Sequence, residues 1–329
     1  MTGDGADDAT DAGDLDGADG ADDADDADGK SPLSRLRLPG ASLSALAIER
    51  GGDVLDSYRP DAVALPASNA KLVTTALALD VLGPAHRFET PAVARGTLDG
   101  TTLDGDLVVR ASGDPSIEVA DLDALAAAVA DRLDRIRGDI VLDVSLFSGP
   151  KFAPGRAWAD GRHAYGAPTG ALSLESNCVT VSVAGDGEGE EDVAVAVTPA
   201  AADVRTAVDL TIDADAAPDD LSVETDQRDG TVSVTGRVPP DVETTVEAPV
   251  VSPARYTGAV LDAALSDVGV TLDGSVVVER DGDARESDGG ADGATTERLG
   301  AIRSPPVRAL VREMNVPSDN VIADQFARA

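Results

Sequence analysis

The sequence predicts an α+β protein in which a helical main domain is interrupted by a large β-rich insertion. Apolar residues recur every three to four positions over residues 68–82, the spacing of an amphipathic helix. Between residues 170 and 250 the pattern changes to short alternating segments, which are typical of strands. Helical spacing returns at 254–265, 307–314 and 320–327. Because helical patterns flank the strand-rich block on both sides, we expect one domain with a block inserted into it.

The individual elements follow from local signals. Alternating apolar residues on both sides of Gly51-Gly52 predict a β-hairpin over 41–58. Gly83-Pro84 ends the helix that is expected over 68–82. Further patterns predict a helix over 122–136, strands at 88–94, 107–111, 140–144, 179–183, 193–197, 210–212 and 231–234, and solvated acidic turns at 185–192 and 281–297.

Four segments result from these boundaries. We expect an acidic, disordered leader over 1–32, a first part of the main domain over 33–87, an inserted β-rich region over 88–250 and a second part of the main domain over 251–329. The leader contains neither a basic start nor an apolar stretch, so it is not expected to act as a signal peptide. Since no apolar run is long enough to span a membrane, the sequence by itself predicts a cytoplasmic protein.

Composition excludes several classes of function. The chain has 329 residues, 61 of them acidic and 26 basic, and a formal net charge of −35. This charge repels nucleic acids and anionic membranes. One cysteine and two histidines argue against a disulfide framework, a metal centre or a Ser-His-Asp triad, and no cofactor is expected. With 47 Asp, 14 Glu and only three Lys, the composition is that of a protein adapted to high salt.

Ser68 and Lys71 are three residues apart at the start of the predicted helix, so their side chains share one face. A partly desolvated lysine loses its proton more readily and can then act as the general base for a serine nucleophile. The alternative is a surface lysine beside a helix-capping serine. Ser148 and Lys151 have the same spacing, but Gly149-Pro150 between them is incompatible with a helix, which predicts a loop.

Ser318-Asp319-Asn320 lies between two predicted helices near the end of the chain. A hydroxyl beside a carboxamide provides a proton relay and a group that binds a substrate amide. The alternative interpretation is a helix cap, because serine and aspartate are both common at helix N-termini.

Further segments extend these motifs. They are residues 65–75, Leu82-Gly83-Pro84, 105–109, Gly113-Asp114-Pro115, 166–168, 172–174 and Pro305-Pro306. Together with the long separation of Ser68 from Ser318, they resemble the D-alanyl-D-alanine carboxypeptidase/endopeptidase family, the class C low-molecular-mass penicillin-binding proteins (peptidase family S13). The resemblance runs from about residue 43 to the last residue.

The resemblance implies a transpeptidase-type α/β/α domain, as in penicillin-binding proteins and serine β-lactamases. It implies that Ser68 forms an acyl-enzyme with peptides ending in D-Ala-D-Ala, that Lys71 takes the serine proton, that Ser318 passes a proton to the leaving amine, and that Asn320 holds the substrate amide. It also implies inhibition by β-lactams and a location outside the cytoplasmic membrane. Asp114 is a candidate for binding the peptide stem, although a turn-capping aspartate before Pro115 is the preferred interpretation.

One departure from the family pattern is the missing Lys-Thr-Gly strand, which normally follows the second serine motif. We therefore expect a C-terminally truncated chain whose last sheet strands are missing. The alternatives are a catalytically impaired penicillin-binding-like protein that binds peptide or glycan, and a related serine esterase or β-lactamase-like hydrolase.

Overall fold

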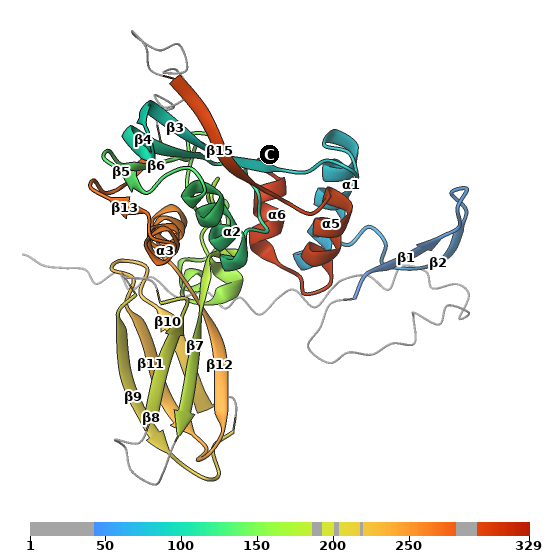
Figure 1. Cartoon of the computed structure of the whole chain (residues 1–329). Helices are drawn as coiled ribbons and strands as arrows, with labels where there is room; N and C mark the ends of the chain where they lie inside the picture. The colour runs from blue at the N-terminus through green and yellow to red at the C-terminus, as the bar shows by residue number, and fades with distance from the viewer. Residues whose placement is uncertain (1–42, 186–192, 201–203, 218–219, 281–294) are drawn as a thin grey trace, which may run out of the picture. The chain divides into compact units, whose positions relative to one another are not determined.

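The computed structural model describes residues 43–185, 193–200, 204–217, 220–280 and 295–329 (Figure 1). It divides into two compact units, one ending at Ala67 and the other running from Ser68 to Ala329, and each is described by itself. The predicted leader over 1–32 lies outside the described residues, as does nearly all of the predicted turn over 185–192.

The first unit contains the hairpin that the sequence predicts. Strands β1 (Ala45–Ile48) and β2 (Val54–Tyr58) pair antiparallel, with Ala45 opposite Tyr58. Gly52 lies in the connecting turn at a φ of +101°, a conformation that glycine adopts without strain. The prediction of a hairpin over 41–58 is therefore confirmed for its described part.

The centre of the second unit is a mixed sheet, to which the described residues contribute seven strands. Strand β4 pairs antiparallel with β3, and its other edge pairs in parallel with β5 and then with β6. The strands are β3 (Glu89–Asp99), β4 (Thr102–Arg110), β5 (Arg135–Ile136), β6 (Ile140–Asp143), β13 (Thr271–Leu272), β14 (Val276–Glu279) and β15 (Thr295–Arg303). The turn predicted over 281–297 is wrong for its last three residues, because β15 begins at Thr295.

Helices α2 (Val119–Ala130) and α3 (Pro253–Asp267) pack against each other and against strands of this sheet (Figure 1). Gly258 allows α3 to approach closely, since a Cβ there would lie 2.7 Å from Leu142 Cδ1. The helix predicted over 122–136 is too long. It ends at Ala130. Ile136, inside the predicted range, is instead a strand residue that pairs with Leu103 and is fully buried.

Residues between 178 and 249 form two three-stranded sheets whose buried valines share one core (Figure 1). The first sheet contains β7 (Cys178–Gly185), β8 (Val193–Thr198) and β12 (Glu243–Pro249), and the second contains β9 (Thr206–Ile212), β10 (Leu221–Thr225) and β11 (Val232–Val238). The strand-rich block is thus confirmed. Strands β10 and β12 were not predicted because their short segments are rich in Glu, Ser and Thr.

A separate helical cluster is formed by α1 (Ala70–Val81), α5 (Val307–Asn315) and α6 (Asn320–Phe326). Ala78 of α1, Leu310 and Met314 of α5, and Phe326 of α6 are buried together. This packing brings the start of α1 close to the start of α6, although about 250 residues separate them in the chain. None of the helices in the described ranges is long and apolar enough to cross a membrane.

Replacing Leu142 by alanine should lower the free energy of unfolding by about 2–5 kcal/mol, because Leu142 is fully buried in β6 and its removal leaves a cavity. Urea titration followed by circular dichroism measures this change. Leu77→Ala is the matched control: Leu77 is 58% exposed on α1, so we expect a change within about 0.5 kcal/mol. Equal losses in the two variants would contradict the assigned burial.

Candidate active site

Ser68 and Lys71 lie at the entrance to helix α1. Ser68 belongs to a single 3-10 turn, Ala67–Asn69, and Lys71 to the first turn of the α-helix that follows. The serine is exposed, whereas Lys71 is only 6% exposed. The Lys71 Nζ lies 3.4 Å from the Ser68 Oγ. The pair therefore combines an accessible hydroxyl with a buried amine on one helix face.

Ser318 and Asn320 complete the cluster from the other end of the chain. The Lys71 Nζ donates to the Ser318 Oγ at 3.3 Å and also to the Asn320 Oδ1. The Ser318 Oγ lies 2.8 Å from the Ser68 Oγ. The lysine amine thus contacts three oxygen atoms.

The surroundings of Lys71 lower its pKa on balance. Burial lowers the pKa of Lys71 below its ordinary value, and Arg156 acts in the same direction, whereas Asp319 and Asp324 oppose the shift. Within the described part of the chain, no carboxylate lies within ion-pair distance of the Lys71 amine. A lysine in such a position can accept a proton from a neighbouring hydroxyl.

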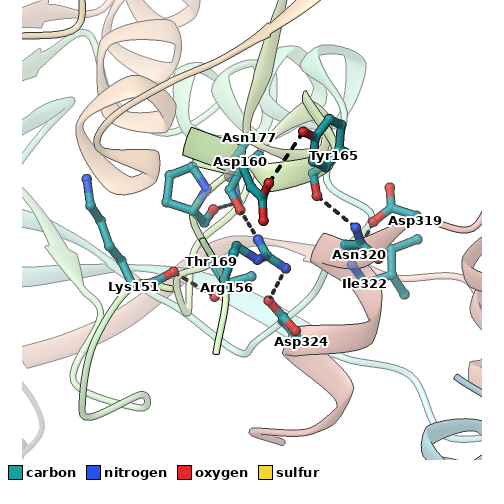
Figure 2. Close-up of polar contacts among 12 residues, drawn as sticks. Lys151, Arg156, Asp160, Tyr165, Thr169, Asn177, Asp319, Asn320, Ile322 and Asp324 are labelled. Atoms are coloured by element: carbon teal, nitrogen blue, oxygen red, sulfur yellow. Dashed lines mark hydrogen bonds and ion pairs between the residues drawn. The ribbon is translucent and has the colours of Figure 1, made fainter. Parts of the chain in front are cut away.

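The two aspartates near Lys71 are held by other partners. Arg156 forms an ion pair with Asp324 at 2.9 Å, as Figure 2 shows. It also donates to the Ala167 carbonyl oxygen. Asp319 accepts a hydrogen bond from the Ile322 backbone N–H, so it caps α6. Because these carboxylates are already bound, their charges reach Lys71 only through space.

Asn320 is fixed at both ends of its carboxamide. Its Nδ2 donates to the Tyr165 carbonyl oxygen at 2.8 Å (Figure 2). Its Oδ1 accepts from Lys71. These two bonds orient the amide group and assign its oxygen to the lysine.

A strained turn supports the second serine motif. Glu175, Ser176 and Asn177 have successive positive φ values of 48°, 48° and 59°. For residues other than glycine, each costs about 1–2 kcal/mol. The Asn177 amide offsets part of this cost by donating to the Pro168 carbonyl oxygen at 2.8 Å. The turn directs the Ser176 hydroxyl to the Asp319 carboxylate at 2.8 Å, beside Ser318.

The structure thus brings together four of the five predicted site residues, namely Ser68, Lys71, Ser318 and Asn320. Asp114 is fully buried, and its Oδ1 accepts hydrogen bonds from the Ser116 N–H and hydroxyl. These two bonds are those of a turn-capping aspartate. The other Ser-Lys pair, residues 148 and 151, lies in a loop, as predicted.

Sequence reasoning missed Tyr165, Arg156, Asp324 and Ser176. The carbonyl of Tyr165 carries no side-chain signal, and the other three act through partners 143–168 residues away. Among the described residues, no group of three or more His, Cys, Asp or Glu side chains could hold a metal ion.

Comparison with known proteins identifies the family. The profile of the D-Ala-D-Ala carboxypeptidase 3 (S13) family matches residues 35–329, and the chain belongs to this family. The D-alanyl-D-alanine carboxypeptidase of Actinomadura sp. (strain R39) is 32% identical over 255 residues, which cover 73% of this chain and 46% of that protein. DacB of Haemophilus influenzae, a D-alanyl-D-alanine carboxypeptidase, is 32% identical over 126 residues, covering 38% of this chain and 26% of its own length.

The chain spans about half the length, or less, of these curated relatives. Among solved structures, penicillin-binding protein 4 (dacB) from Haemophilus influenzae matches with a TM-score of 0.69 at 24% identity, over 84% of this chain and 59% of that one. The same protein complexed with a novel β-lactam matches with a TM-score of 0.66 at 23% identity, over 88% and 60%. The fold is therefore like that of penicillin-binding protein 4, with parallel strands in its core sheet and additional β-sheets, and the predicted family is confirmed.

Asp319→Ala should lower the free energy of unfolding by about 0.5–2 kcal/mol, because it removes the cap of α6. Asp319→Asn is the matched control, since asparagine caps a helix about as well as aspartate. Urea titration of both variants at the same salt concentration measures the difference. If the asparagine variant loses as much stability as the alanine variant, capping is not the role of Asp319.

Proposed function

We propose that this chain carries the nucleophile and general base of a serine-type D-Ala-D-Ala carboxypeptidase, with endopeptidase action on related cross-links. The observation that supports this most directly is the Lys71 amine, which is 6% exposed and lies 3.4 Å from the exposed Ser68 hydroxyl. Family membership supports the substrate class, because the curated relatives are named D-alanyl-D-alanine carboxypeptidases.

In the proposed reaction, the Ser68 Oγ attacks the carbonyl carbon of the penultimate D-alanine, and its proton moves to the neutral Lys71 amine. The tetrahedral intermediate then collapses, and the C–N bond to the last D-alanine breaks. The Ser318 hydroxyl bridges the two groups, since it lies 2.8 Å from the Ser68 Oγ and 3.3 Å from the Lys71 Nζ. It therefore passes a proton to the leaving amine.

Water completes the cycle by attacking the ester carbonyl and releasing the shortened peptide from Ser68. The backbone N–H of Ser68 supplies one hydrogen-bond donor to the oxyanion of the tetrahedral intermediate. Asn320 holds the Lys71 amine and binds the substrate amide. A β-lactam would enter the same pathway: its ring amide opens on attack by Ser68, and the acyl group stays attached. The β-lactam complex of the Haemophilus influenzae protein supports this class of inhibitor.

The finer architecture is part of the same proposal. We infer that residues 33–87 and 251–329 contribute to one transpeptidase-type catalytic domain and that 88–250 is inserted between them. Support comes from the shared core of α1, α5 and α6, which contains residues from both ends of the chain.

Incubation with a fluorescent penicillin tests this function, with covalent labelling detected on a denaturing gel at several salt concentrations. We expect labelling of the unsubstituted chain and none of Ser68→Ala, because the acylated oxygen is gone. Ser148→Ala is the matched control, since it alters the second Ser-Lys pair, and it should label normally. Labelling of Ser68→Ala, or none of a folded unsubstituted chain, would contradict the proposal.

Release of D-alanine from a D-Ala-D-Ala peptide separates the remaining alternatives. Peptide binding without release would indicate the catalytically impaired binding protein, whereas hydrolysis of a simple ester or β-lactam alone would indicate the related hydrolase.

A further inference from the structure

Lys151, which the proposed reaction does not use, lines a second pocket. This pocket has a volume of about 240 Å³ and lies between the loop that contains Lys151, the start of α3, and Arg280 and Arg328. In Figure 2 the Lys151 side chain extends away from the Arg156–Asp324 pair. None of Ser68, Lys71, Ser318 and Asn320 lines the pocket.

The charges around this pocket are unusual for the protein. Lys151, Arg280 and Arg328 line it, and no carboxylate of the described residues does so, although the chain has 61 acidic and 26 basic residues. A larger cavity of about 1010 Å³, beside Asp319, is lined by five carboxylates and one arginine. The small pocket is therefore locally cationic on a strongly anionic protein, and it attracts anions.

Two of the cations are held in place by neutral partners. The Lys151 Nζ donates to the Val251 carbonyl oxygen at 2.9 Å. The backbone carbonyl oxygen of Lys151 accepts from the Thr169 N–H and hydroxyl. Arg328 donates to the Pro150 carbonyl oxygen at 2.7 Å, with its guanidinium 5.9 Å from the centre of the Phe147 ring. Lysine has three donors and arginine five, so both side chains keep donors for a ligand.

The start of α3 adds to the same potential. Pro253 and Ala254 line the pocket, and Ser252 precedes the helix without a capping hydrogen bond from its side chain. Pro253 has no N–H, but the N–H groups that follow it in the first turn have no intrahelical acceptor and favour negative charge. The dipole of this 15-residue helix thus acts together with the three side chains.

We propose that Lys151, Arg280 and Arg328 form a binding site for a phosphate group. Three positive charges suit a group that carries about two negative charges near pH 7. The volume suits a compact oxyanion, because sites for drug-sized ligands occupy about 300–1,000 Å³. The group is either inorganic phosphate or the terminal phosphate of a larger molecule.

Phosphorus NMR tests this site on the full chain. Inorganic phosphate and glycerol phosphate are titrated separately at constant ionic strength and pH, and the dissociation constant is obtained from line broadening. We expect saturable binding, weakened about tenfold or more by Lys151→Gln and by Arg280→Gln, because each loses a charged hydrogen-bond donor. Tighter binding of glycerol phosphate would identify the terminal group of a larger molecule as the ligand.

Arg255→Gln is the matched control. Arg255 is exposed on the same helix but does not line this pocket, so the substitution should leave the dissociation constant unchanged. Ser68→Ala should also bind phosphate normally, which separates this site from the proposed catalysis. If circular dichroism shows that Lys151→Gln does not fold, Arg280→Gln alone tests the site, because Arg280 is exposed and its replacement should not affect folding. Absence of saturable binding, or equal losses in Arg280→Gln and Arg255→Gln, would overturn the proposal.

Discussion

The amine of Lys71 is buried in a place where the described residues provide oxygen atoms of two serines and one asparagine but no carboxylate in contact. Burying a cation away from water is costly, so burial lowers the pKa of Lys71, although Asp319 and Asp324 oppose this shift through space. The arrangement depends on hydrophobic packing elsewhere, because α1 and α6 are also held together where Ala78, Leu310 and Phe326 are buried. The hydrophobic core of α1, α5 and α6 therefore determines where the Lys71 amine is buried, and with it the direction of its pKa shift.

The segments between the two serine motifs hold this arrangement from the outside. The Tyr165 carbonyl fixes Asn320, Arg156 forms an ion pair with Asp324, and Ser176 donates to Asp319. The strained turn at 175–177 places that serine, which is a physical reason for three non-glycine residues to adopt positive φ values in succession. The segment between the two serine motifs thus provides three contacts that hold residues of the site in place.

Prediction from the sequence succeeded where the signal was local. The hairpin and α1 have clear turn and periodicity signals, and the Ser68–Lys71 spacing itself implies a shared face. It failed where contacts between residues far apart in the chain determine the structure. Ile136 became a strand residue because of its pairing beside Leu103, and β15 begins inside a segment with the composition of a turn. The Arg156–Asp324 pair joins residues 168 positions apart, which no local pattern can reveal.

The ionisation of Lys71 is the most direct test, and the chain has only three lysines, Lys30, Lys71 and Lys151. Selective isotope labelling of lysine, with Lys151→Arg to assign the signals, gives the titration of each amine by NMR. We expect Lys71 to titrate below its ordinary value of 10.5, and Arg156→Gln to move the midpoint upward because it removes a nearby cation. A Lys71 amine that titrates at or above 10.5 would contradict the account.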